Sequence, residues 1–102
     1  MEYQIETTAV FDKWFKKLKD RKVKQRINSR FLFLEQGHFG DHESLGETEG
    51  IELFELRFFF GAGYRIYYIL RDNQIILLMN GGDKASQSKD IDKARKLLTD
   101  LE

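Results

Sequence analysis

Three strand-like segments follow one another between residues 51 and 81, and the links that join them are very short. The segments Ile51–Phe60, Tyr64–Arg71 and Gln74–Gly81 are rich in β-branched and aromatic residues, which favour extended backbone. Gly61-Ala62-Gly63 and Asp72-Asn73 separate them. Links of this length and composition are typical of β-hairpins. The chain is therefore expected to build a three-stranded antiparallel meander, around which every other segment has to pack.

The segments on either side of the meander show the period of amphipathic helices. Residues 3–7 alternate as a short strand, and Thr7 or Thr8 can cap the helix that follows. The apolar stripe of that helix is Phe11, Trp14, Phe15 and Leu18. Asp20 can cap a second helix, which Gly37 ends and whose stripe is Val23, Ile27, Phe31 and Leu34. Residues 37–50 are expected to be a loop and residues 87–101 a final helix.

This order of elements predicts an α+β fold in a single domain, residues 1–102. We expect an N-terminal strand, a helical hairpin, the meander and a C-terminal helix, with the helices mainly on one face of the sheet. The chain has no cysteine, which excludes disulfides and thiolate metal sites. Residues 1–20 contain no apolar signal-peptide segment, so we expect a cytoplasmic protein without a membrane partner.

The formal net charge of zero hides a strong asymmetry along the chain. Residues 12–30 contain nine lysines and arginines and two acids, whereas residues 31–56 contain seven acids and no lysine or arginine. The two segments can simply be solvated faces of opposite sign. The other interpretation is a basic surface for a polyanion beside an acidic surface for a different partner.

Two cations are expected at neighbouring strand ends, next to glycines. If Phe60 pairs with Tyr64 across a three-residue loop, parity places Arg57, Phe59, Arg65 and Tyr67 on one face, together with Glu55. A four-residue loop would split the two arginines. Lys84 follows the Gly81-Gly82 pair at the end of the next strand, where backbone can approach a ligand closely. Each arginine can be an exposed edge side chain, but the cluster suits a phosphate.

Several short motifs occur in a distinctive order along the chain. They are Phe11-Asp-Lys-Trp14, Phe39-Gly-Asp41, Glu55-Leu-Arg57, Gly61-x-Gly-Tyr-Arg65-Ile-Tyr67, and Gly81-Gly-Asp-Lys84 followed by Gln87. The set resembles the HigB-like "addiction module killer" branch of the RelE/ParE toxin superfamily. The resemblance implies the toxin of a bacterial type II toxin–antitoxin pair. It also implies a metal-independent endoribonuclease that cuts mRNA, usually on the ribosome, and a cognate antitoxin, often of the helix-turn-helix type.

The resemblance is incomplete at the positions that transfer protons. Leu53 and Glu55 stand where RelE-like enzymes carry lysines, and residues 87–102 contain no counterpart of the RelE-type catalytic tyrosine. Metal-free cleavage uses the ribose 2′-hydroxyl as nucleophile and needs a base, an acid and cations for the oxyanion. We expect Arg65 to stabilise the oxyanion and Lys84 to clamp the phosphate or to donate a proton. We expect the other roles to fall to Arg57 for positioning, Glu55 as base, and Tyr67 or Phe59 for base stacking.

Other functions remain compatible with these residues. ParE-type relatives act on DNA gyrase without cleaving RNA, and an inactive module that only pairs with an antitoxin would keep the same fold. His38 and His42 lie in an acidic segment and are expected to be solvated, since no third ligand is fixed by spacing. Neither a metal nor another cofactor is expected, and Trp14 is expected to belong to the core.

Overall fold

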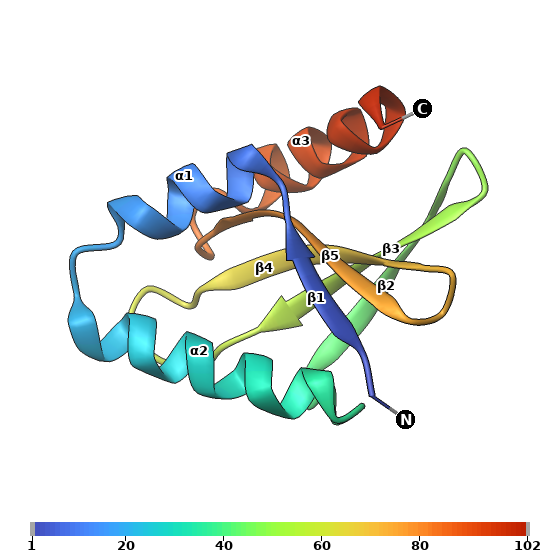
Figure 1. Ribbon diagram of the computed structural model, residues 1–102. Coiled ribbons are helices and arrows are strands. Elements are labelled where there is room, and N and C mark those ends of the chain that lie inside the picture. Colours follow the sequence, from blue (N-terminus) through green and yellow to red (C-terminus); the bar gives the residue numbers. More distant parts are fainter. Residues whose placement is uncertain (1, 102) are drawn as a thin grey trace.

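The structure, a computed structural model, describes residues 2–101 as a five-stranded sheet with three helices (Figure 1). The elements are β1 (Gln4–Thr7), α1 (Ala9–Lys17), α2 (Arg21–Glu35), β2 (His42–Thr48), β3 (Ile51–Arg57), β4 (Arg65–Arg71), β5 (Ile75–Gly82) and α3 (Gln87–Asp100). The strand order is β1-β5-β4-β3-β2, with β1 parallel to β5 and all other neighbours antiparallel. The expected α+β class is confirmed. None of the described helices is long and apolar enough to cross a membrane.

The meander has one strand more than predicted, because residues 42–48 form β2 instead of a loop. This strand pairs with β3 alone at the edge of the sheet, so most of its side chains face solvent. Its sequence lacks an apolar side, and a register shift between Ser44 and Glu47 interrupts the pairing. The conformation of such a strand depends on its neighbour, and the sequence has no period that reveals it.

The helices α1 and α2 pack on one face of the sheet, as expected. Thr8 caps α1 by accepting a hydrogen bond from the Phe11 amide (3.0 Å). Asp20 caps α2 by accepting one from the Lys22 amide (2.9 Å). Both predicted stripes face the sheet, and the buried core on this side consists of Phe11, Val23, Ile27, Leu34, Leu56, Phe58, Ile66, Tyr68, Ile76 and Leu78.

The third helix, α3, packs on the opposite face. The expectation that the helices lie mainly on one face therefore holds for two of the three, and α3 covers part of the face that was expected to be open. Arg95 ties α3 to the edge of the sheet by donating to the Leu45 carbonyl (3.1 Å). The second core consists of Leu53, Tyr67, Ile69, Leu77, Met79, Ala94 and Leu98.

A β-bulge near the end of β5 changes which residues point to which face. Tyr68 lies opposite Leu78, whereas Tyr67 lies opposite Asn80, so Met79 is the extra residue. Without the bulge, Asn80 would share the face of Leu78, which belongs to the α1–α2 core. With it, Asn80 lies on the α3 side, where its Nδ2 donates to a carbonyl of α3 (3.0 Å).

The two glycines after the bulge let both helix layers approach β5 closely. A Cβ atom built at Gly81 would lie 2.4 Å from the nearest atom of the Trp14 ring on α1. A Cβ atom built at Gly82 would lie 1.8 Å from Oδ2 of Asp90 on α3. Neither φ angle is positive. The glycines are therefore required for close approach, and not for a special backbone conformation.

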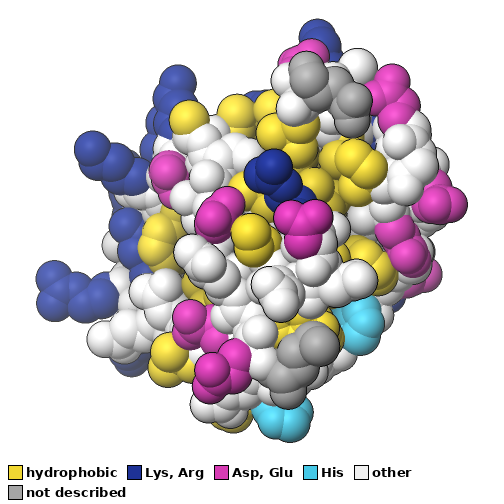
Figure 2. Space-filling view, turned by 45° about the vertical axis from the view of Figure 1, so that its right-hand side comes forward, with side chains coloured by type: hydrophobic (Ala, Val, Ile, Leu, Met, Phe, Trp, Pro, Cys, Tyr) yellow, Lys and Arg dark blue, Asp and Glu magenta, His cyan; other side chains and the backbone are white. Residues whose placement is uncertain are grey.

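Basic and acidic side chains are separated on the surface, as their distribution along the chain indicates. The basic segment, residues 12–30, contains most of α1 and the first ten residues of α2, and the acidic segment contains β2. In Figure 2, lysine and arginine side chains project along the left margin, whereas aspartate and glutamate predominate along the right. The chain therefore presents a charged surface of each sign in spite of its zero net charge.

Candidate functional site

The ends of β3 and β4 bring the two predicted arginines side by side. Arg57 on β3 lies directly opposite Arg65 on β4. In the adjoining row, Glu55 on β3 lies opposite Tyr67 on β4, which in turn lies opposite Asn80 on β5. Residues directly opposite each other share a face of the sheet, and so do residues two apart in one strand. All five side chains therefore lie on the face where α3 packs.

The predicted face is confirmed, but the predicted pairing of Phe60 with Tyr64 is wrong by two residues. The Phe58 amide donates to the Tyr64 carbonyl (3.0 Å), so a longer loop joins the strands. A shift of two residues preserves parity, which is why the arginines still share a face. Phe59 leaves the sheet altogether and lies in this loop, 83% exposed.

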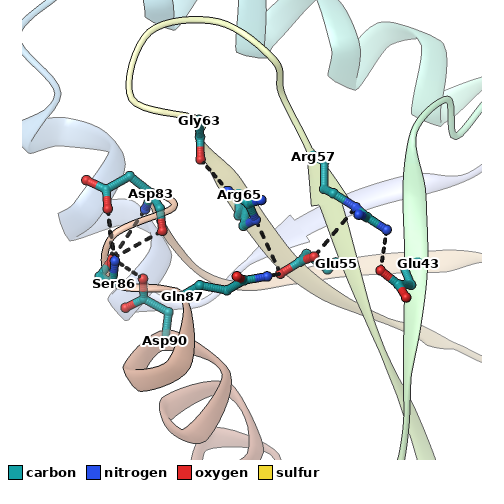
Figure 3. A network of polar contacts seen from close by, with 9 residues as sticks. All are labelled: Glu43, Glu55, Arg57, Gly63, Arg65, Asp83, Ser86, Gln87 and Asp90. Atoms are coloured by element: carbon teal, nitrogen blue, oxygen red, sulfur yellow. Dashed lines mark hydrogen bonds and ion pairs between the residues drawn. The ribbon is translucent and has the colours of Figure 1, made fainter.

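Glu55 lies at the centre of a polar network, which Figure 3 shows from close by. Its carboxylate oxygens are each 3.6 Å from an arginine Nε, Oε1 from that of Arg57 and Oε2 from that of Arg65. Nε2 of Gln87, at the start of α3, donates to Glu55 Oε2 (2.8 Å). Arg57 also forms an ion pair with Glu43 of β2. Residues from β3, β4 and α3 therefore meet at one carboxylate, and Arg57 connects it to β2.

The enclosure of Glu55 differs from that of its cationic partners. Glu55 is 1% exposed, whereas the side chains of Arg57 and Arg65 are 28% and 13% exposed. Burying an isolated carboxylate costs several kcal/mol, which two guanidinium groups and an amide donor offset here. Arg65 is held further by its bond from Nη1 to the Gly63 carbonyl (2.8 Å). The result is a pair of preoriented cations that an incoming anion can reach.

Tyr67 does not have the role that was expected of it. The side chain is fully buried, so no face of the ring is open for a nucleobase to stack on. Burial and, after it, the charge of Glu55 raise the pKa of Tyr67 well above its usual value. Its hydroxyl has no hydrogen-bond partner among residues 2–101. Tyr67 is thus a neutral neighbour of Glu55, and Phe59 is the exposed aromatic side chain beside the site.

Lys84 lies beside the loop between β3 and β4. Its amide donates to the Ala62 carbonyl (3.3 Å), and a Cβ atom at Gly63 would lie 3.3 Å from Lys84 Cβ and 3.5 Å from Arg65 Nη1. The lysine side chain is exposed. Arg65 and Lys84 are therefore brought together where β4 begins and β5 ends, as the glycine-rich strand ends suggested.

Three contributors to this site were not predicted from the sequence as such. Gln87 was noted only as part of a motif, and Glu43 was placed in a loop. Arg30 of α2 donates to the Arg57 carbonyl (2.8 Å) and so holds the end of β3. The spacing of these residues along the chain gives no signal, because each contact joins segments that are distant in sequence. The apolar stripe of α2 identifies the buried face of that helix, but it does not identify a polar residue such as Arg30 at the margin of that face.

The two histidines, His38 and His42, are exposed, as expected. His42 begins β2, and its Nδ1 lies 3.0 Å from the Gly40 carbonyl. Its ring lies between those of Phe39 and Phe54, with centroids 5.6 Å and 6.3 Å away. Across the described part of the chain, no group of three or more His, Cys, Asp or Glu side chains could hold a metal ion.

Related proteins are known from sequence and from structure. The family described as "Phage derived protein Gp49-like" matches residues 13–99. A protein of Haemophilus influenzae, described as uncharacterized, is 42% identical over 101 residues and is matched over 98% of its length, with 99% of this chain.

Two solved structures share the fold. A mutant of the E. coli toxin RelE in the free state has a TM-score of 0.70 at 17% identity, over 94% of this chain and 97% of that one. The toxin–antitoxin complex RelBE2 from Mycobacterium tuberculosis contains a chain with a TM-score of 0.64, also at 17% identity, over 82% of this chain and 100% of that one. The resemblance to RelE toxins is thus confirmed at the level of the fold.

Proposed function

Because the chain belongs to the Gp49-like family of phage-derived proteins and has the fold of the RelE toxins, we propose that it is the toxin of a bacterial toxin–antitoxin pair. We further propose that it is a metal-independent endoribonuclease that cleaves mRNA in the cytoplasm, in association with the ribosome. The supporting observation is the pair of preoriented guanidinium groups, Arg57 and Arg65, held over one buried carboxylate. Two such groups match the charge and geometry of a phosphodiester in RNA.

In the proposed reaction, the ribose 2′-hydroxyl attacks the adjacent phosphorus and the bond to the 5′-oxygen breaks. Arg65 and Arg57 stabilise the pentacoordinate oxyanion, because their donors are fixed before the substrate arrives. The exposed Lys84 donates a proton to the leaving oxygen. Glu55 is less suited to be the base than the sequence suggested, since both of its oxygens face guanidinium groups and it is enclosed. Glu55 then acts as a positioning residue. Glu43 accepts the proton, because its side chain is 55% exposed and pairs with one guanidinium group only, that of Arg57.

The proposed partner is an antitoxin encoded beside the toxin. The solved RelBE2 structure is a toxin–antitoxin complex, and its toxin-like chain shares the fold of this protein. By analogy, the antitoxin would neutralise the toxin by covering it. A helix-turn-helix antitoxin, which the sequence resemblance suggests, remains part of the proposal. Co-purification of the chain with the product of the neighbouring gene would test it.

The decisive experiment is a comparison of Arg65→Ala with the wild type. After brief expression, the 5′ ends of cellular RNA are mapped and growth is followed. The wild type should produce new cuts linked to codons, and Arg65→Ala should lower cleavage by about 100-fold or more, as the loss of an oxyanion donor does elsewhere. Arg71→Ala is the matched control, because Arg71 is exposed at the other end of the same strand.

Each other outcome identifies a different function. If Arg65→Ala stays fully toxic, the site assignment is wrong. Double-strand DNA breaks without RNA cuts would indicate a gyrase-directed toxin of the ParE type. If the wild type produces neither, the chain is an inactive module that pairs with an antitoxin. Folding of each variant is checked by circular dichroism and by binding to the antitoxin, which Arg65→Ala should retain.

A further inference from the structure

A second polar concavity lies on the far side of β5 from the two arginines. This α1–α3 groove, of about 410 Å³, is lined by Trp14, Lys13 and Lys17 of α1, by Asn80 and Gly81 of β5, and by Lys93 of α3, among others. The pairing of β1 with β5 ends at Leu78, so the last residues of β5 have no neighbouring strand on this side. The groove follows this uncovered strand edge, and residues of α1 and α3 line it. Both helices lie near the end of β5 (Figure 1).

The lining of the groove combines three kinds of group. Lys13, Lys17 and Lys93 are exposed along it. Trp14 packs over Gly81 and remains partly exposed, so it offers aromatic surface to the groove. Asn80 is buried, and its Oδ1 has no hydrogen-bond partner within residues 2–101.

These three kinds of group complement the parts of a nucleotide: the cations, the aromatic ring and the unpaired hydrogen-bond acceptor. Lysines pair with phosphates, and bases of any sequence stack on aromatic side chains. An amide acceptor can take a hydrogen bond from a base amino group. Asp90 is the one acidic side chain that lines the groove among the described residues, and Ser86 Oγ already donates to it. The groove therefore keeps a net positive lining.

The groove lies close to the arginine site. Gly81 lines the groove, and the next residue, Gly82, lies directly opposite Arg65, one strand spacing or about 4.8 Å from the Arg65 backbone. The row from Glu55 through Tyr67 to Asn80 joins the two sites across the sheet, but its side chains are buried. A single strand with one phosphate at Arg57 and Arg65 would therefore reach the groove around the end of β5, past the exposed Lys84.

We propose that the α1–α3 groove binds a nucleotide of single-stranded RNA that flanks the phosphate held by Arg57 and Arg65. The base lies against Trp14, and the three lysines contact the backbone phosphates. The choice of RNA as the ligand rests on the proposed function. The groove and the chemistry of its lining are features of the structure and do not depend on that function. Nucleotides beyond the cut would then contribute to binding and to the choice of the cleavage position.

Trp14 is the single tryptophan of the chain, so its fluorescence reports directly on the groove. The purified full chain is titrated with a short single-stranded RNA whose 2′-hydroxyls are methylated and which therefore cannot be cut. We expect saturable quenching of Trp14. Lys17→Ala/Lys93→Ala should weaken binding about tenfold or more and reduce its salt dependence. The matched control is Lys16→Ala/Lys96→Ala, which removes two exposed lysines from the same helices outside the groove.

Several results would overturn the proposal. Equal weakening by both double variants would mean that only the overall charge matters. RNA binding seen by fluorescence anisotropy without quenching of Trp14 would place the strand elsewhere. Equal quenching by heparin at the same charge concentration would remove the role of the base. Cleavage of unmodified RNA is measured in parallel: cleavage without quenching refutes the groove alone, quenching without cleavage refutes the nuclease alone, and the absence of both refutes both.

Discussion

Glu55 is an enclosed carboxylate that lies against two partly exposed guanidinium groups of the candidate site. It is one of two buried polar or charged side chains among residues 2–101, the other being Asn80. Its carboxylate fixes the orientation of two guanidinium groups, and these groups are more exposed to solvent than the carboxylate is. The orientation of the cations thus depends on the charge beneath them, because no other acidic group contacts Arg65 in the described structure.

Replacing Glu55 with glutamine should destabilise the protein as well as misplace the arginines. The size of the side chain is kept, but its charge is lost, and two partly buried cations lose a counter-charge. We expect the free energy of unfolding to fall by about 2 kcal/mol, measured by urea denaturation. Glu52→Gln on the same strand is the control and should stay within about 0.5 kcal/mol, because Glu52 is exposed. Equal effects of the two variants would contradict the central position of Glu55.

For single residues, the sequence predicted which face of the sheet a side chain lies on, but it did not predict how deeply the side chain is buried. Parity placed Glu55, Arg57 and Arg65 on one face correctly, since the side-chain period of a strand is two. Parity does not show how deeply a side chain is buried, and Glu55 is enclosed. The enclosure comes from Gln87, which is 32 residues away in the chain. No local pattern contains a contact of that kind.

Among the elements, β5 is constrained by a helix on each face. Gly81→Ala should destabilise the chain, because a methyl group would have to displace the Trp14 ring. Overpacking of this kind costs about 1–3 kcal/mol, and chemical denaturation would measure it. In a Trp14→Ala background the same substitution should cost much less. If the cost of Gly81→Ala is the same in both backgrounds, the ring contact is not its cause.

The elements whose own residues show an apolar period were predicted, and β2, which shows none, was missed. The caps at Thr8 and Asp20 formed as expected, and Gly37 lies just beyond the end of α2 with a φ of 87°. By contrast, β2 has no apolar side, and the turn residues on either side of it, Gly40 and Glu49-Gly50, are equally typical of a loop. It forms because β3 offers an unpaired edge, and that edge exists only once the meander has folded.

At the scale of the whole molecule, two buried tyrosines should limit stability in alkali. Burial raises the pKa of both Tyr67 and Tyr68 above the ordinary value. In the unfolded chain both release a proton near pH 10, while in the folded protein they stay protonated. The unfolded state therefore binds fewer protons, and each tyrosine should lower the free energy of unfolding by up to about 1.4 kcal/mol per pH unit above pH 10.

Denaturation with urea at a series of pH values would measure this slope. Tyr67→Phe and Tyr68→Phe should each make it shallower, and the double variant should combine the two effects. Below about pH 9 the contribution of both tyrosines is fully present, so the slopes of the variants and the wild type should coincide there. A slope above pH 10 that neither substitution changes would show that both phenols ionise in the folded state.

The fold class was predictable, whereas the placement of α3 was not. The order of strand, helix pair, meander and helix follows from local periods and turn residues, which the sequence contains. An amphipathic stripe shows that α3 has a buried side, with Ala94 and Leu98 on it, but both faces of the sheet are apolar enough to receive it. Long-range packing decides between the faces, and it also creates the groove between α1 and α3.

The bulge at Met79 has a consequence for how this sequence can change over generations. Successive residues of a strand point to opposite faces, and the bulge decides that Gly81 faces α1 and Gly82 faces α3. Substitutions at these adjacent positions therefore affect unrelated neighbours. Gly81 can vary once the side chain at position 14 becomes smaller, and Gly82 can vary once the side chain at position 90 does. The residue at position 81 is therefore expected to vary together with α1, and the residue at position 82 together with α3, each independently of the other.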